Sequence, residues 1–179
     1  MQTPRLIFHP RDPQQLVAQP NLNQAMQGIG FIGQRLQTVP GESYAAGEHF
    51  IELLSFLGCS PVINLSAADG DKFCYVELLS LSDAELLIGS QPFQPRCRQC
   101  RTELPDWQMQ WAQQRIIECP GCGIRMAPQQ VNWRQSAGFA RQFMLVHNIY
   151  LHEAVPGEKL MGSLQACSEN KKWNYFYAI

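Results

Sequence analysis

The chain has 179 residues, of which 45% are hydrophobic, so it can bury the core of one domain or of one domain that carries a small module. Its formal net charge of -1 excludes a global basic field of the kind that attracts nucleic acid. No apolar run is long enough to span a membrane, and the N-terminus lacks the regions of a secretory signal. We therefore expect a soluble, cytoplasmic protein.

The first residues predict short elements separated by prolines. We expect a short edge strand at residues 6–8, a short helix near residues 23–27 and a strand that ends near Leu36. Glycines alternate with apolar residues over 28–33, but the GxGxxG spacing is missing and no Lys-Ser or Lys-Thr pair follows. These glycines therefore do not predict a phosphate-binding loop.

A longer helix is predicted next. Residues 41–47 are expected to form a loop or a first turn, in which Ser43 is a candidate N-cap. From residue 48 onward, apolar residues recur at helical spacing and form one stripe, which consists of Phe50, Leu53, Leu54 and Leu57. Gly58 stands where a glycine would end this helix.

A hairpin is predicted from two strands, at residues 61–66 and 72–80, joined by a polar turn at residues 67–71. Period-two alternation in the second strand places Cys74, Val76 and Leu78 on one face. The other face then carries Phe73, Tyr75, Glu77 and Leu79. Residues 84–88 are expected to form a third short strand or a brief helix.

The last third of the chain predicts a strand, a helix and a strand. The strand covers residues 143–151. The helix opens at residues 156–158, and its apolar stripe consists of Leu160, Met161, Leu164 and Cys167. Asn170 is expected to be left-handed after this helix. The final strand covers residues 173–179 and alternates between two faces.

These elements predict an α+β fold with a mostly antiparallel sheet and two helices on one face. A ferredoxin-like arrangement fits the order of elements. We expect residues 1–92 and 135–179 to form this domain and residues 93–134 to form an inserted module.

Four cysteines dominate that module. Cys97 and Cys100 form one C-x2-C pair and Cys119 and Cys122 form another, eighteen residues later. A two-residue gap lets both thiolates of a pair point at one ion, so two pairs at this distance predict a closed tetrahedral site with four sulfur ligands. Two disulfides are the alternative, and the absence of a secretory signal disfavours them.

The second pair, with Pro120, Gly121 and Gly123, resembles the knuckles of zinc ribbons and rubredoxins. The first pair has no proline or glycine, so non-glycine residues must hold its turn. The resemblance covers about residues 97–122 and implies a zinc ribbon without implying an activity. We expect one structural zinc ion, and iron is the alternative because a four-sulfur shell suits it too.

Inside the module, Trp107, Met109 and Trp111 alternate with glutamines, which predicts a strand in a short hairpin. Residues 93–134 also carry six arginines, namely Arg96, Arg98, Arg101, Arg115, Arg125 and Arg134, against Glu103, Asp106 and Glu118. These arginines, with Trp107, Trp111 and Trp133 as stacking platforms, support a nucleic-acid-binding hypothesis. The alternative is that the tryptophans pack the core of the module.

An enzyme is a third hypothesis, with a site near His152 and Glu153 at the end of a strand. His147, Cys59 and Glu77 are further candidates. His147 shares strand parity with apolar residues, so a core histidine is the alternative. No nucleophile–base pair or carboxylate pair can be recognised.

A closed four-cysteine shell leaves no coordination position for water or substrate. We therefore favour a zinc-binding protein without catalytic activity whose partner is another protein. Nucleic-acid binding and catalysis remain the two alternatives.

Overall fold

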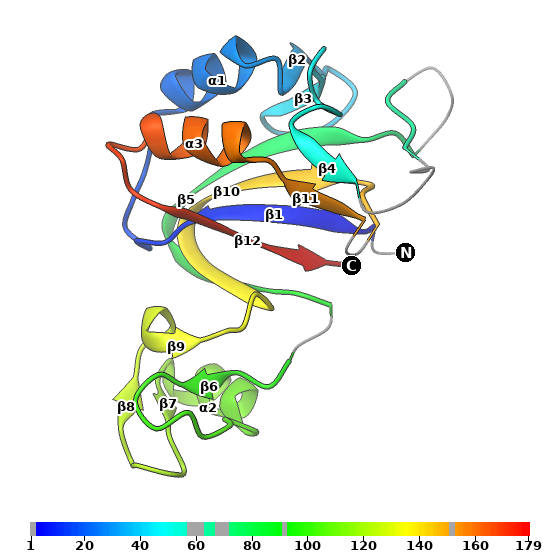
Figure 1. The fold of residues 1–179 in the computed structure, drawn as a ribbon. Helices are drawn as coiled ribbons and strands as arrows, with labels where there is room; N and C mark the ends of the chain where they lie inside the picture. The colour runs from blue at the N-terminus through cyan, green and yellow to red at the C-terminus, as the bar shows by residue number, and fades with distance from the viewer. Residues whose placement is uncertain (1–2, 57–62, 67–71, 91–92, 151–152) are drawn as a thin grey trace.

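The computed structural model describes residues 3–56, 63–66, 72–90, 93–150 and 153–179 (Figure 1). Within these residues the chain forms a six-stranded sheet, three two-stranded sheets and three α-helices. The six-stranded sheet is antiparallel throughout. The predicted α+β class is therefore confirmed.

The order of strands across the sheet is β12 (Trp173–Ala178), β1 (Arg5–Pro10), β10 (Ala137–His147), β5 (Tyr75–Ile88), β3 (Ser43–Ala46) and β2 (Ile32–Arg35). Helix α1 (Gln19–Gly28) follows β1, and helix α3 (Glu158–Ala166) lies between β10 and β12. Numbered in chain order, β1, β5, β10 and β12 stand in the order four, one, three, two. This is the β-α-β-β-α-β arrangement of ferredoxin-like folds, extended at one edge by β3 and β2.

Helices α1 and α3 cover one face of the sheet, as Figure 1 shows. Leu22 and Met26 of α1 and Leu160 of α3 are fully buried there. They pack into the same core as alternate strand residues, which are Leu6, Phe8, Val76, Leu78, Met144 and Val146. Because successive strand side chains point to opposite faces, this set fixes which face of each strand meets the helices.

The long paired strands β5 and β10 are here called the β5–β10 hairpin. They bend so that one end of the hairpin covers the face of the sheet opposite the helices. Its register shifts between Ala140 and Gln142, and an irregularity of this kind bends a strand pair. A Cβ atom added at Gly138 would lie 2.5 Å from the ring of His9 on β1, and one at Gly89 would lie 2.4 Å from a β12 carbonyl. The bent hairpin thus closes over a second core, which contains Ile7, Ala140, Phe143, Leu145, Phe176 and Ala178.

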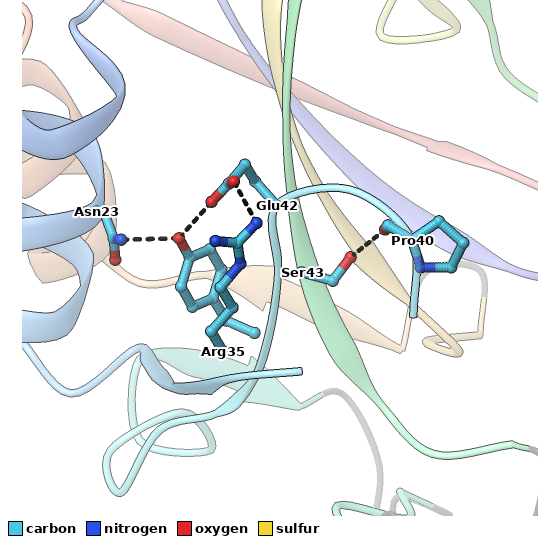
Figure 2. Close-up of polar contacts among 6 residues, drawn as sticks. Asn23, Arg35, Pro40, Glu42 and Ser43 are labelled. Atoms are coloured by element: carbon cyan, nitrogen blue, oxygen red, sulfur yellow. Dashed lines mark hydrogen bonds and ion pairs between the residues drawn. The ribbon is translucent and has the colours of Figure 1, made fainter. Parts of the chain in front are cut away.

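A polar network fixes the added β2–β3 hairpin to α1 (Figure 2). The Asn23 amide on α1 donates to the hydroxyl of Tyr44 at 2.7 Å, and this hydroxyl donates to Glu42 at 2.9 Å. The other oxygen of Glu42 pairs with Arg35 at 2.5 Å. The chain thereby links an exposed edge of the sheet to the helical layer.

The predicted helix from residue 48 is wrong. Residues 48–53 form consecutive turns, and Leu54–Phe56 form strand β4, which pairs with β11 (Ala154–Pro156). Phe50, Leu53 and Leu54 are nevertheless buried. The apolar pattern therefore predicts correctly which side chains are buried, but not the backbone conformation. Residue 57 and Gly58 lie outside the described residues.

Three further predictions need correction. Residues 6–8 belong to β1, which is not an edge strand because it pairs with both β10 and β12. Ser43 begins β3 and is not an N-cap. Residues 63–66 have no strand structure, and β5 pairs with β10 and β3 instead.

The strand predicted at residues 143–151 is β10, which begins earlier and ends at His147, and β11 was not predicted. Several other elements agree with their predictions. Helix α1 and β2 stand where a helix and a strand were expected, and residues 84–88 continue β5 as a strand. Asn170 has a φ of 61° after α3. Tyr175 and Tyr177 pack on the helical side of β12, and Phe176 packs on the other. Among the described helices, none has the length and apolar character required to span a bilayer.

Candidate metal centre

Residues 93–134, here called the cysteine segment, connect β5 to β10 and extend away from the sheet (Figure 1). The elements in this segment are β6 (Arg96–Cys97), α2 (Trp107–Gln114), β7 (Ile117–Glu118), β8 (Arg125–Met126), the 3-10 turn Pro128–Gln130 and β9 (Val131–Asn132). Strand β6 pairs with β9, and β7 pairs with β8.

The predicted strand at Trp107 to Trp111 is wrong, because these residues belong to helix α2. Trp107 and Trp111 are four residues apart, and this spacing puts them on one side of a helix. Met109 is 57% exposed on the other side. Arg115, with a φ of 56°, ends the helix in the left-handed region.

The two cysteine pairs lie in turns of the same construction. The N–H of Cys119 donates to Ile124 at 2.9 Å, and the N–H of Gly123 donates to the carbonyl of Cys119 at 2.8 Å. In the first pair, the backbone N–H of Cys97 donates to the carbonyl of Thr102, and the backbone N–H of Arg101 donates to the carbonyl of Cys97, both at 2.9 Å. Arg101 therefore occupies the position of Gly123, and its φ is 64° against 71° for Gly123.

The two turns meet at Gly121. A Cβ atom added there would lie 2.3 Å from the hydroxyl oxygen of Thr102, so only glycine fits against the first turn. Thr102 also contacts the sulfur of Cys100 at 3.2 Å. The glycine of the second turn and the threonine that follows the first thus bring the two cysteine pairs together.

The four sulfurs form a compact cluster, in which all of them lie within 4.8 Å of one another. The Sγ atoms of Cys97 and Cys122 are 3.8 Å apart, and those of Cys100 and Cys119 are 3.4 Å apart. Sulfurs bound at about 2.3 Å to a tetrahedral zinc lie about 3.8 Å from one another. The four cysteines, all of them free thiols, are therefore positioned to bind one metal ion.

The electrostatics of the cluster favour a bound cation. Hydrogen bonding to Thr102 lowers the pKa of the Cys100 thiol to about 6, so one thiolate forms easily. The backbone of Ile124 lowers the pKa of Cys122, but desolvation and the neighbouring sulfurs outweigh it and raise this pKa to about 12. Four thiolates at this separation repel one another unless a metal ion neutralises them.

A small apolar core supports the centre from one side. Trp107 and Trp133 meet edge to face at 4.8 Å, and the Trp133 indole donates to the carbonyl of Pro128. Trp111 packs against Phe139 of β10 at 5.9 Å. These three tryptophans thus pack the cysteine segment and join it to the hairpin, which is the alternative weighed against base stacking.

The structure brings two enzyme candidates together, His147 and Glu77. The Nε2 atom of His147 lies 2.8 Å from Glu77, and the Tyr75 ring stacks on the imidazole at 4.3 Å. His147 is only 8% exposed, so it is a largely buried residue of the sheet, as its strand parity predicts. Tyr75 was not among the candidates, although its place two residues before Glu77 in a strand implies the same face.

The remaining candidates lie elsewhere or cannot be placed. Glu153 is half-buried, and its N–H donates to the carbonyl of Tyr150. His152 and Cys59 are outside the described residues. Cys74, which is not one of these candidates, is a buried thiol, and burial raises its pKa to about 12, which makes it unreactive.

Thr102 and Arg101 were also missed as site residues. The signal was present in the chain, because Arg101 stands four residues after Cys97 just as Gly123 stands four residues after Cys119. Comparisons of the chain with models of protein families, with curated proteins and with solved structures gave no match.

Proposed function

We propose that this is a protein-binding or adaptor protein without catalytic activity, in which the cysteine segment folds around one structural zinc ion. The observation that carries the proposal is the closed cluster of four sulfurs within 4.8 Å. When cysteine supplies all four ligands, no position remains for water or substrate. Such a metal ion stabilises the segment and leaves any interaction to the surrounding surface.

Zinc suits this centre better than iron. Zinc has no redox chemistry and accepts tetrahedral sulfur ligation without a partner for electron transfer. Reduced thiols are required in either case, so the proposal includes a reducing compartment such as the cytoplasm.

A protein partner is favoured over nucleic acid because the tryptophans are committed to packing. Trp107 is 3% exposed and Trp133 is 9% exposed, so neither offers a ring face to a base. A nucleic-acid role would depend on the half-buried Trp111 and on the arginines, and Arg96 already pairs with Glu103 at 2.9 Å. A catalytic site near His152 and Glu153 stays a prediction.

Elemental analysis of the freshly purified chain tests the metal, and the expected result is one zinc per chain. The Cys119→Ser variant should lose the metal, whereas the control Cys167→Ser should keep it, because Cys167 lies on α3's apolar side outside the cluster. Iron, or no metal, would contradict the zinc proposal.

Affinity capture with chemical cross-linking tests the partner. The wild type and Cys167→Ser should recover the same protein, and Cys119→Ser should recover less of it. Recovery of nucleic acid in place of protein, in a form sensitive to nuclease, would favour the alternative role.

A further inference from the structure

A groove runs along the outer edge of β12, where the sheet meets the cysteine segment. Its volume is about 300 Å³, and it lies between Tyr175 of β12, Met161 of α3 and Trp133 at the exit from the cysteine segment. A second depression continues it, since both are lined by Arg134, Gln135 and Tyr175. The two form one elongated groove, which begins near His9 and ends near Val155.

The lining of this groove is basic. Arg11, Arg98 and Arg134 line it, and its described lining residues include no aspartate or glutamate. None of these three arginines takes part in an ion pair among the described residues. Three guanidinium groups without acidic partners favour an anionic ligand, above all one with carboxylates that accept paired hydrogen bonds.

The arginine at the centre of the groove is held in place. The guanidinium of Arg134 lies 5.1 Å from the centre of the Phe93 ring, a distance at which a cation is attracted to an aromatic face. Arg134 and Gln135 both have positive φ and lie in a turn. The backbone N–H of Ser136 closes this turn, because it donates to the carbonyl of Trp133 at 3.0 Å. The turn directs Arg134 to the groove before any ligand arrives.

The wall formed by β12 also offers backbone groups. The N–H of Arg11 donates to Lys172 at 2.8 Å, and the next paired residues are Pro10 with Trp173 and His9 with Asn174. In an antiparallel pair, opposite residues are alternately hydrogen-bonded to each other and not hydrogen-bonded. The backbone of Asn174 therefore bonds to β1, whereas the N–H and C=O of Tyr175 point away from β1. No backbone bond to Tyr175 outside the β1–β12 pair occurs among the described residues.

We infer that this groove binds an extended acidic segment of a partner protein, which adds a strand beside β12 at Tyr175 and places its carboxylates on Arg11, Arg98 and Arg134. This inference rests on the proposed protein-binding function and names the partner's chemistry. The strand supplies main-chain hydrogen bonds, and the arginines select for acidic side chains on alternate residues.

Two other occupants fit less well. A single-stranded nucleic acid offers phosphates to the arginines but no backbone that pairs with a strand edge, and Trp133 is too buried to stack on a base. A second copy of this chain, paired edge to edge, would bring the same three arginines face to face.

Fluorescence anisotropy with the zinc-loaded chain of 179 residues tests the inference. The probe is a short labelled peptide of alternating glutamate and valine. Two control peptides replace glutamate by glutamine or carry N-methyl groups on the backbone that faces β12. We expect binding of the acidic probe, which weakens at higher salt, and at least about fivefold weaker binding of both controls.

Charge-removing variants locate the site. Each of Arg11→Gln, Arg98→Gln and Arg134→Gln should weaken binding by about fivefold, and the triple variant by about a hundredfold. The matched control is Arg125→Gln, which removes the same charge from an exposed position of the cysteine segment outside the groove and should leave the affinity unchanged. Zinc content and the circular dichroism spectrum verify that each variant is folded.

Three results would overturn the inference. They are equal binding of the acidic and N-methylated peptides, equal loss in Arg125→Gln, and tighter binding of labelled oligothymidine than of the peptide. If the peptide fails while the chain still holds one zinc and captures a protein, the groove assignment is wrong and the proposed function stands. If metal and partner fail as well, the proposed function is wrong too.

Discussion

The sheet and the cysteine segment achieve stability by different means. Among the described residues, the core between the sheet and its two helices contains twenty-one buried side chains, which lie between Leu6 and Leu78 and between Met144 and Trp173. The cluster of the cysteine segment contains nine, of which two are Cys97 and Cys119 and one, Ala137, belongs to β10. Burial of apolar area can hold the first region together, whereas the second needs an additional source of free energy.

The difference shows why the cysteines are concentrated where they are. Strands β6, β7, β8 and β9 contain two residues each and cannot form a stable sheet alone. A metal ion bound between the two turns would replace the missing core, because its binding free energy would become folding free energy. Experiments that act on one region at a time test whether the two regions differ in this way.

Removal of the metal should have the largest effect and should be confined to the cysteine segment. Structural zinc contributes roughly 10 kcal/mol or more in small peptides, which is a large share of the stability of a segment with only nine buried residues in its cluster. After chelation we expect fast amide exchange over β6 to β9 and a red-shifted tryptophan emission, since Trp107 and Trp133 would become exposed. Amide exchange in β1 and β10 should stay slow, and exchange that is unchanged in both regions would refute the metal's structural role.

A cavity under the bent hairpin should have the next largest effect. Phe143 is fully buried against the second face of the sheet. We expect Phe143→Ala to lower the free energy of unfolding by about 3–5 kcal/mol and to leave the zinc content unchanged. The control Ile51→Ala, at a side chain 48% exposed, should change it by less than about 0.5 kcal/mol in denaturant titration. A loss of zinc in Phe143→Ala would show that the two regions are not independent.

Acid should weaken the sheet through His9. Desolvation lowers the pKa of this histidine from 6.5 to about 4, against the raising effect of its bond to the Pro10 carbonyl. The unfolded chain therefore binds more protons below about pH 6.5, and stability falls as the pH falls towards the folded pKa. Between about pH 7 and pH 5 we expect a loss of about 2 kcal/mol from this group.

The control for His9 compares the change in the free energy of unfolding between the two pH values, and not the free energy at a single pH. His9→Asn retains a donor for the Pro10 carbonyl but has no group that titrates in this range, so its loss between the two pH values should be smaller by that amount. Equal pH slopes for His9→Asn and wild type would show that His9 does not titrate with unfolding.

The smallest effects should distinguish the two cysteine turns. Gly123→Ala forces a side chain into a φ of 71° and should destabilise the cysteine segment by about 1 kcal/mol. Arg101→Gly relieves the same conformation in the first turn and should stabilise the segment by up to about 1 kcal/mol. Zinc affinity in a competition titration measures both, and effects of the same sign would contradict the equivalence of the turns.

Local patterns in the chain were enough to predict the cysteine cluster and several elements of the fold. The spacing of the cysteine pairs identified the cluster, because four ligands in two tight turns need no information from elsewhere in the fold. Helix α3, β12 and the two faces of β5 followed from periodicity, since each residue pattern agreed with the element's burial. The ferredoxin-like order also followed from the succession of elements.

Patterns failed where distant contacts decide conformation. The stripe from Phe50 to Leu54 has helical spacing, yet the chain there must turn to let Leu54–Phe56 pair with β11, a hundred residues later. Alternation at Trp107 to Trp111 predicted a strand, but the two tryptophans pack on Trp133 and Phe139, and a helix presents both on one side.

Only the tertiary structure decided what the second face of the sheet does and where the groove lies. The bend between Ala140 and Gln142 folds the β5–β10 hairpin over Ile7 and Phe176. That bend also carries Arg134 to the edge of β12, beside Arg11 and Tyr175. Arg11 is more than a hundred positions from both Arg134 and Tyr175 in the chain, and no local pattern reports contacts at that distance.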